Sequence, residues 1–182
     1  IVTGVMPPPF FQAFWKEALK QKFKPRIVTV GKASEFPAAL MPFRSDAHGM
    51  SVEVWWCPTF PYRSGMTGQS ARQLADDYMQ TTGRNWTMPL GFKHALFEVA
   101  LDVLKRSSGP RDRRGIRDAI RSLNYESMVG PVNFQTGPVP NISKTPLAAG
   151  QWDYRFRNLE LLIVDNVGAP EVPKQAHLRP MM

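Results

Sequence analysis

Apolar and polar residues alternate along the chain with the periods of secondary structure. Residues 1–4 look like the end of a buried strand, so we expect further chain upstream of them. In residues 9–21 the apolar positions follow the i, i+3, i+4 spacing of an amphipathic helix: Phe11, Phe14, Trp15, Ala18 and Leu19. Residues 27–30 are a short β-branched run, typical of a parallel strand covered on both faces. This strand, helix, strand order predicts βαβ units with right-handed crossovers.

The rest of the chain continues the alternation of helix and strand patterns. Helices are expected at residues 34–40, between a cap at Thr67 or Ser70 and a stop at Gly83, and at residues 90–106 and 113–123. In the helix at 90–106, one apolar side is expected to carry Phe92, Leu96, Val99 and Val103. Strands are expected at residues 50–56 and 129–134, and residues 150–153 and 159–165 are expected to pair as an antiparallel hairpin. The pattern therefore predicts an α/β protein.

Composition narrows the class of protein without identifying it. The chain has 182 residues and is 43% hydrophobic, enough for a real core, which excludes disorder as its overall state. No apolar run reaches the length of a membrane-spanning helix, and the N-terminus lacks the pattern of an export signal. The net charge of +8 is compatible with anionic ligands, nucleic acid or membrane headgroups and does not choose among them.

Searches for catalytic and metal-binding patterns find little. His48, His94 and His177 lie far apart and outside any ligand spacing, so we expect no metal. The single Cys57 excludes an intramolecular disulfide and is interpreted as a small core residue. The segment 65–70 lacks the ending of a phosphate loop and is interpreted as a surface loop with an N-cap. The carboxylates of two helices, Asp76, Asp77, Glu98 and Asp102, are assigned to solvated faces. The residues therefore predict neither an enzyme nor a cofactor.

A cluster of arginines is the main candidate for contact with an anion. It comprises Arg111, Arg113, Arg114, Arg117 and Arg121. On a helix with this spacing, a solvated face is the preferred interpretation. A basic nucleic-acid-binding module remains a minor alternative, and it predicts binding to duplex DNA that falls steeply with salt.

Several short motifs occur in an order that resembles a known family. They are Gly4-Val5-Met6-Pro7, the segment 23–31, Gly49-Met50 leading into Trp55-Trp56, the segment 89–95 that begins Pro-Leu-Gly-Phe, and the segment 129–134 that begins Val-Gly-Pro-Val. Together they resemble the second half of a type I periplasmic solute-binding protein, closest to the branched-chain amino acid (leucine/isoleucine/valine) binding group of ABC importers. The resemblance covers nearly all of the chain.

The resemblance implies a bilobed fold of two three-layer α/β lobes joined by a hinge, with this chain as a fragment that lacks the N-terminal part. It places residues 1–52 in the second lobe, 53–57 in a hinge crossing, 58–130 in the first lobe, 131–135 in another crossing, and 136–182 in a C-terminal hairpin and tail of the second lobe. It further implies a periplasmic, non-catalytic protein that delivers a small solute to a membrane permease, without nucleic acid. A ligand-sensing domain of a receptor or regulator has the same fold and is the alternative.

The ligand site is expected beyond the carboxyl ends of the strands, as in other doubly wound folds. The candidate residues lie in the first loop, in the second loop, at the hinge and at the start of a helix: Val5, Met6 and Pro7; Lys32; Trp55 and Trp56; Leu90 and Phe92. In the family an acidic group that binds the ammonium of an amino acid falls at or within one residue of Lys32. Because a lysine repels an ammonium, we expect an aromatic or short-chain carboxylate rather than a branched-chain amino acid.

Three of these candidates carry competing interpretations. Successive strand residues face opposite sides, so Trp55 and Trp56 are not both expected to line the site. Phe92 is equally compatible with a core position, and Lys32 with solvent. His94 is expected to pack or hydrogen-bond locally.

Overall fold

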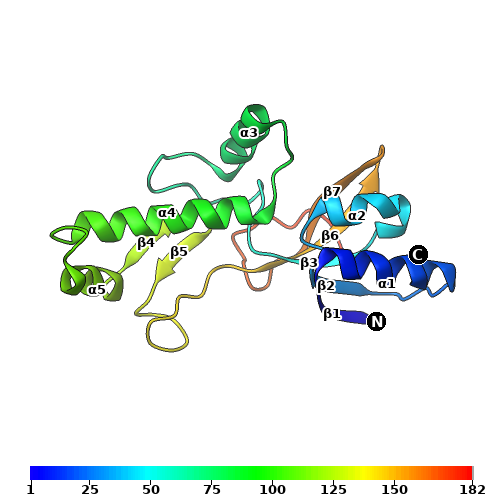
Figure 1. Cartoon of the computed structure of the whole chain (residues 1–182), viewed down its shortest axis with the longest axis horizontal. Coiled ribbons are helices and arrows are strands. Elements are labelled where there is room, and N and C mark those ends of the chain that lie inside the picture. Colours follow the sequence, from blue (N-terminus) through cyan, green and yellow to red (C-terminus); the bar gives the residue numbers. More distant parts are fainter. Residues whose placement is uncertain (182) are drawn as a thin grey trace. The chain divides into compact units, whose positions relative to one another are not determined.

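The computed structural model describes residues 1–181, which divide into two units (Figure 1). Unit 1 comprises Ile1–Val54 and the chain from Leu147 onward, and unit 2 comprises Trp55–Pro146. The first change of unit therefore falls between Val54 and Trp55. Residues 131–135, expected as a second crossing, lie in unit 2, and the chain returns to unit 1 only at Leu147.

Unit 1 is built on a mixed five-stranded sheet whose strand order is β1-β2-β3-β6-β7. The first three strands are parallel to one another, while β6 runs antiparallel to β3 and β7 antiparallel to β6. The hairpin expected near the C-terminus is confirmed by this β6–β7 pair. The strand bounds are β1 (Val2–Met6), β2 (Val28–Lys32), β3 (Ser51–Val54), β6 (Ala148–Arg155) and β7 (Asn158–Asp165).

The helices of unit 1 are α1 (Pro8–Lys20), α2 (Pro37–Leu40) and the 3-10 segment η1 (Met41–Ala47). The apolar stripe of α1 buries Phe11 and Trp15, whose rings stack at 6.1 Å. The Trp15 indole N–H donates to the Asp46 carbonyl at 3.3 Å, which ties α1 to η1. The helix expected at residues 34–40 begins only at Pro37, because proline is favoured in a first turn.

One face of the unit 1 sheet is covered and the other is partly open. Val28, Val30, Val52 and Val54 are buried, while the alternating Thr29, Ser51 and Glu53 are partly exposed and border a hollow of about 460 Å³. The expectation that residues 27–30 are covered on both faces is therefore wrong. The expected buried strand at residues 1–4 is also wrong: β1 lies at the sheet edge, with its side chains largely exposed. Over β6 this second face is covered by the C-terminal segment, where Gln151 is buried and exchanges hydrogen bonds with the backbone of Arg179.

Unit 2 contains three helices and a two-stranded sheet. Its elements are α3 (Ala71–Thr82), α4 (Met88–Arg106), α5 (Arg113–Arg121), β4 (Asn124–Ser127) and β5 (Gly130–Asn133), with β4 and β5 antiparallel. Ser70 caps α3 in a capping box with Gln73, and Gly83 ends it at φ 67°. These caps confirm the expected limits of that helix, since glycine adopts the left-handed backbone without a Cβ penalty.

A small hydrophobic core holds α4, α5 and the β4–β5 hairpin together. Its buried members are Val103, Ala119, Leu123 and Val132. The long helix confirms the expected element, but Leu96 is 67% exposed and is not part of its buried side. Glu98 is 1% exposed and accepts the Met128 N–H at 2.8 Å, so its assignment to a solvated face is wrong.

Close contact between α4 and Trp56 requires glycine at position 91. Trp56 is fully buried, and its ring meets Trp86 edge-on at 5.9 Å. A Cβ at Gly91 would lie 2.2 Å from Cγ of Trp56. The absence of a side chain therefore lets the indole lie directly against the helix backbone.

Gly91→Ala is expected to lower the free energy of unfolding by about 1–3 kcal/mol, because the new methyl group overlaps the Trp56 ring. At an unobstructed helix position the same change stabilises a protein by up to about 1 kcal/mol. A urea titration followed by tryptophan fluorescence measures the free energy of unfolding of the variant and of the parent. A lower value for the variant supports the close contact between Gly91 and Trp56, and a higher value contradicts it.

Candidate functional site

The carboxyl ends of β1 and β2 bring together the unit 1 residues that the sequence suggested. In the parallel register Val5 pairs with Gly31, and Met6 with Lys32. Val5 is 73% exposed, Met6 is partly exposed, and Pro7 follows as the residue before α1. The two loops thus begin side by side at one edge of the sheet.

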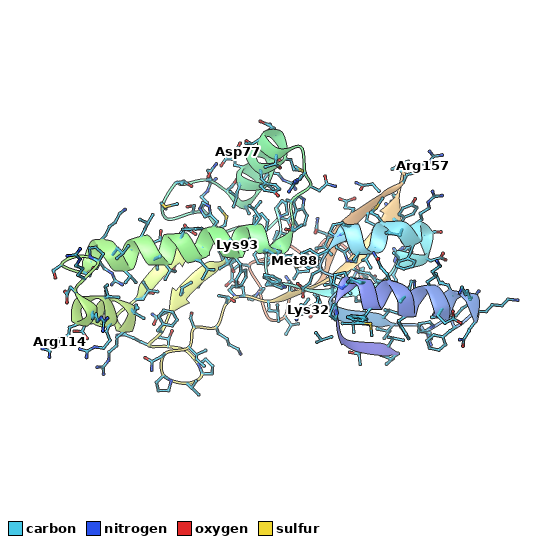
Figure 2. The ribbon with its side chains drawn as sticks, in the orientation of Figure 1. Lys32, Asp77, Met88, Lys93, Arg114 and Arg157 are labelled. Carbon is cyan, nitrogen blue, oxygen red and sulfur yellow. The ribbon has the colours of Figure 1, made fainter. Side chains whose placement is uncertain are left out.

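The loop after β2 is a tight turn held by backbone hydrogen bonds. Lys32 has φ 67°, the Ala33 N–H donates to the Gly31 carbonyl at 2.9 Å, and the Ser34 N–H donates to the Val30 carbonyl at 3.0 Å. The Ser34 carbonyl in turn accepts the Trp152 indole N–H at 2.7 Å. Lys32 is exposed in this turn, next to the beginning of α1 (Figure 2).

Two glutamates, neither of them among the residues expected from the sequence, lie beside Gly31 and Lys32. Glu35 accepts the Lys32 backbone N–H at 2.8 Å. Glu53, on β3, lies over the neighbouring strand: a Cβ at Gly31 would be only 3.0 Å from its Oε1 atom. Gly31 therefore leaves room for a carboxylate on the open side of the sheet. No short motif marks these residues, since they are far apart in sequence and each is ordinary in its own segment.

The electrostatics of this cluster favour a protonated carboxyl group. Partial burial raises the pKa of Glu35, and the adjacent Glu53 carboxylate raises it further, while the Lys32 N–H and the Lys32 charge act in the opposite direction. The cluster therefore combines one lysine with two carboxyl groups, one of which holds its proton to a higher pH than usual.

The candidate residues of unit 2 form an aromatic group at the start of α4. Trp55 is partly exposed and meets Phe92 edge-on, with ring centroids 4.9 Å apart. Leu90 is partly exposed on the first turn of α4, whereas Trp56 has no exposed surface. Of the two tryptophans, Trp55 is the one available to a ligand.

His94, on α4, forms a hydrogen bond with Ser64, in the loop before α3. Ser64 Oγ accepts the N–H groups of Met66 and Thr67, and it lies 2.9 Å from His94 Nε2. With both N–H groups donated to it, the hydroxyl donates its own hydrogen to the imidazole. His94 therefore anchors the loop before α3, as a locally bonded residue.

Cys57 and the possible metal ligands are the remaining candidates from the sequence. Burial raises the pKa of the Cys57 thiol, which opposes formation of a reactive thiolate. Within residues 1–181, His, Cys, Asp and Glu side chains form no group of three that can hold a metal ion.

Comparison with known proteins identifies the fold. No protein-family model and no curated protein sequence matches the chain. Among solved structures, a leucine-binding protein from Thermotoga maritima matches 91% of the chain with a TM-score of 0.68 at 12% identity. A putative branched-chain amino acid ABC transporter from Silicibacter pomeroyi matches all of it with a TM-score of 0.67 at 14% identity. The chain has the type I periplasmic-binding-protein fold.

The chain corresponds to less than half of a periplasmic binding protein, since it spans 44% and 48% of those two structures. A third match is a solute-binding protein of an ABC transporter from Rhodopseudomonas palustris in complex with 3,4-dihydroxybenzoic acid. It has a TM-score of 0.57 and 14% identity, with 86% of this chain and 49% of that one covered. By their descriptions, these three proteins bind a solute or belong to ABC transporters.

The raised pKa of Glu35 predicts a specific dependence of stability on pH. The unfolded carboxyl group is half ionised at pH 4.5, whereas the folded one has a higher pKa, so the free energy of unfolding falls as pH rises from 4.5 through the folded pKa. Glu35→Gln keeps an acceptor for the Lys32 N–H and is expected to remove this component. Chemical denaturation between pH 4 and 8, at about one-unit steps, measures it.

Glu17→Gln is the matched control for this measurement. Hydrogen bonds from Gln21 and Lys20, together with the Lys20 charge, lower the pKa of Glu17, which gives the opposite pH dependence. If the two variants change the pH profile in the same direction, the environment assigned to Glu35 is wrong.

Proposed function

We propose that the chain is part of the extracytoplasmic solute-binding component of an ABC importer, which closes two lobes over a small molecule without catalysing a reaction. The observation that carries this proposal is the match of 91% of the chain to a leucine-binding protein with a TM-score of 0.68. Its partner is then the membrane permease, and its location the periplasm. None of the helices in residues 1–181 is long and apolar enough to cross a membrane.

For the ligand we propose an aromatic or short-chain carboxylate. Lys32 is exposed at the carboxyl ends of the strands and supplies a positive charge, and partial burial raises the pKa of the neighbouring Glu35 carboxyl group. Within unit 1, Val5, Met6 and Pro7 are the proposed apolar neighbours of Lys32. Within unit 2, Trp55 and Phe92, with Leu90 on the same first turns of α4, are proposed as a separate aromatic surface for an apolar or ring-shaped group.

The acidic pair supports a second candidate, an α-amino acid. Glu35 and Glu53 lie within the same cluster as Lys32, and an ionised carboxylate there favours an ammonium group. The leucine-binding protein among the matched structures makes this class a natural comparison. The two candidates differ in the sign of their pH dependence.

The first experiment is a ligand panel on the complete mature protein that contains this chain. Aromatic carboxylates, short aliphatic acids and branched-chain amino acids are titrated while intrinsic tryptophan fluorescence is followed. A saturable response at micromolar or lower concentration to an amine-free acid supports the carboxylate proposal. Response to amino acids alone selects the second candidate, and no response to any solute contradicts the proposal of a carboxylate or amino acid ligand.

Lys32→Gln is expected to raise the dissociation constant for an amine-free carboxylate about tenfold, which corresponds to loss of one charge-assisted hydrogen bond of about 1.5 kcal/mol. Lys16→Gln, on the exposed side of α1, is the control for the loss of one positive charge and is expected to bind as the parent does. Equal effects of the two substitutions contradict a direct role for Lys32.

The pH dependence of binding is expected to distinguish the two ligand classes. As pH rises through the raised pKa of Glu35, its new negative charge weakens binding of a carboxylate and strengthens binding of an ammonium group. Isothermal titration at several pH values, repeated with Glu35→Gln, measures this change. Affinity for an amine-free acid that increases with pH in the parent protein contradicts the carboxylate proposal.

A further inference from the structure

The exposed arginines of α5 occupy one side of a single short helix. At about 100° per residue, Arg113, Arg117, Arg121 and Arg114 fall within an arc of about 100°. All four are exposed, and Arg114 extends from the outer side of α5 (Figure 2). The opposite side of the helix carries Ala119, which belongs to the unit 2 core. Because Ala119 packs into the core, the four arginines point away from it.

Little within the described chain neutralises this arc. Arg117 forms an ion pair with Asp118 at 2.7 Å. Within residues 1–181, the guanidinium groups of Arg113, Arg114 and Arg121 have no ion pair or hydrogen-bond acceptor. The other nearby carboxylate, Asp112, is used as the N-cap, where it accepts the Gly115 N–H at 2.9 Å and the Ser108 hydroxyl.

The arrangement is electrostatically unfavourable for the helix alone. Arg113 and Arg117, and likewise Arg117 and Arg121, are like charges at i, i+4. Arg113 and Arg114 also occupy the first turn, where the helix dipole disfavours cations. A layer of negative charge placed against the arc relieves both effects. Arg106, by contrast, is occupied by Asp102 and by the Ala119 carbonyl and belongs to the packing between helices.

One exposed apolar side chain borders the arc. Ile120 is 40% exposed and lies within about 20° of Arg113, whereas Ile116 packs against the core of unit 2. A basic arc beside an exposed aliphatic side chain suits the interface of a membrane, where guanidinium groups meet lipid phosphates and the aliphatic side chain enters the headgroup boundary. We propose that the α5 arc, Arg113, Arg114, Arg117 and Arg121, is a docking surface for an anionic phospholipid bilayer.

The test is co-sedimentation of the complete mature protein that contains this chain with vesicles of phosphatidylglycerol and phosphatidylcholine, compared with phosphatidylcholine alone, at physiological ionic strength. The quadruple variant R113Q/R114Q/R117Q/R121Q keeps helix-forming side chains and lowers the net charge of this chain from +8 to +4 (8 − 4). The control K16Q/K22Q/K24Q/K174Q removes the same charge from exposed lysines of unit 1. The expected result is a loss of at least tenfold in partitioning for the α5 variant and less than threefold for the control.

Three results overturn the proposal. They are equal losses in the two variants, which assign binding to net charge; no binding of the parent protein to the anionic vesicles; and tighter binding of the parent to duplex DNA than to those vesicles. Thermal unfolding of the α5 variant checks its folding, and a transition no lower than that of the parent is expected because repulsion between the arginines is removed. If that variant is less stable, single Gln substitutions at Arg114 and Arg121 replace it, each expected to weaken partitioning by about fivefold.

Discussion

The hydrogen bond from the Trp152 indole to the Ser34 carbonyl holds the candidate site in place. It joins two residues 118 positions apart, both of them buried, so that neither group has water as an alternative partner. A buried carbonyl left without a donor carries a desolvation cost of about 1–3 kcal/mol, which keeps the turn after β2 closed. That turn sets the backbone of Lys32 at φ 67° and presents Glu35 to the Lys32 N–H. The charged cluster thus rests on a contact with an antiparallel strand from the far end of the sequence.

The open face of the unit 1 sheet explains why charged groups gather there. A residue with a large side chain at position 31 would displace the Glu53 carboxylate, so Gly31 and Glu53 act together. The face is neither fully solvated nor covered, and this intermediate burial favours the neutral form of Glu35 without excluding its ionised form. Lys32 by itself favours an anionic ligand. With Glu35 and Glu53 beside it, the net charge of the cluster becomes more negative as pH rises, so its preference between an anionic and a cationic ligand group depends on pH.

Local patterns predicted most of the elements, although not η1 or β4, and they failed where the outcome depends on packing between distant residues. Helix limits at Ser70 and Gly83 follow from capping chemistry, which acts over a few residues and is visible in sequence. Burial of Glu98 was not predictable in this way, because the Met128 N–H that it accepts lies 30 positions away. The acidic pair was missed for the same reason: β2 and β3 bring Glu35 and Glu53 together, and neither segment shows a motif. The match to solved structures establishes the fold, while ligand contacts remain predictions.

Buried and partly exposed residues alternate from Ser51 to Trp56, and this alternation decides which side chains pack in the core and which remain accessible. Val52, Val54 and Trp56 are buried, while Ser51, Glu53 and Trp55 are partly exposed, so the period of two continues past the end of β3. Trp56 is fixed by the contact that Gly91 permits, and this commitment to the core leaves Trp55 on the accessible side. A shift of one residue in this segment would bury Glu53 and Trp55 and expose Val54 and Trp56. The packing of Trp56 against α4 therefore determines which tryptophan of unit 2 is accessible, while the pairing of β3 with β6 in unit 1 determines the side on which Glu53 lies.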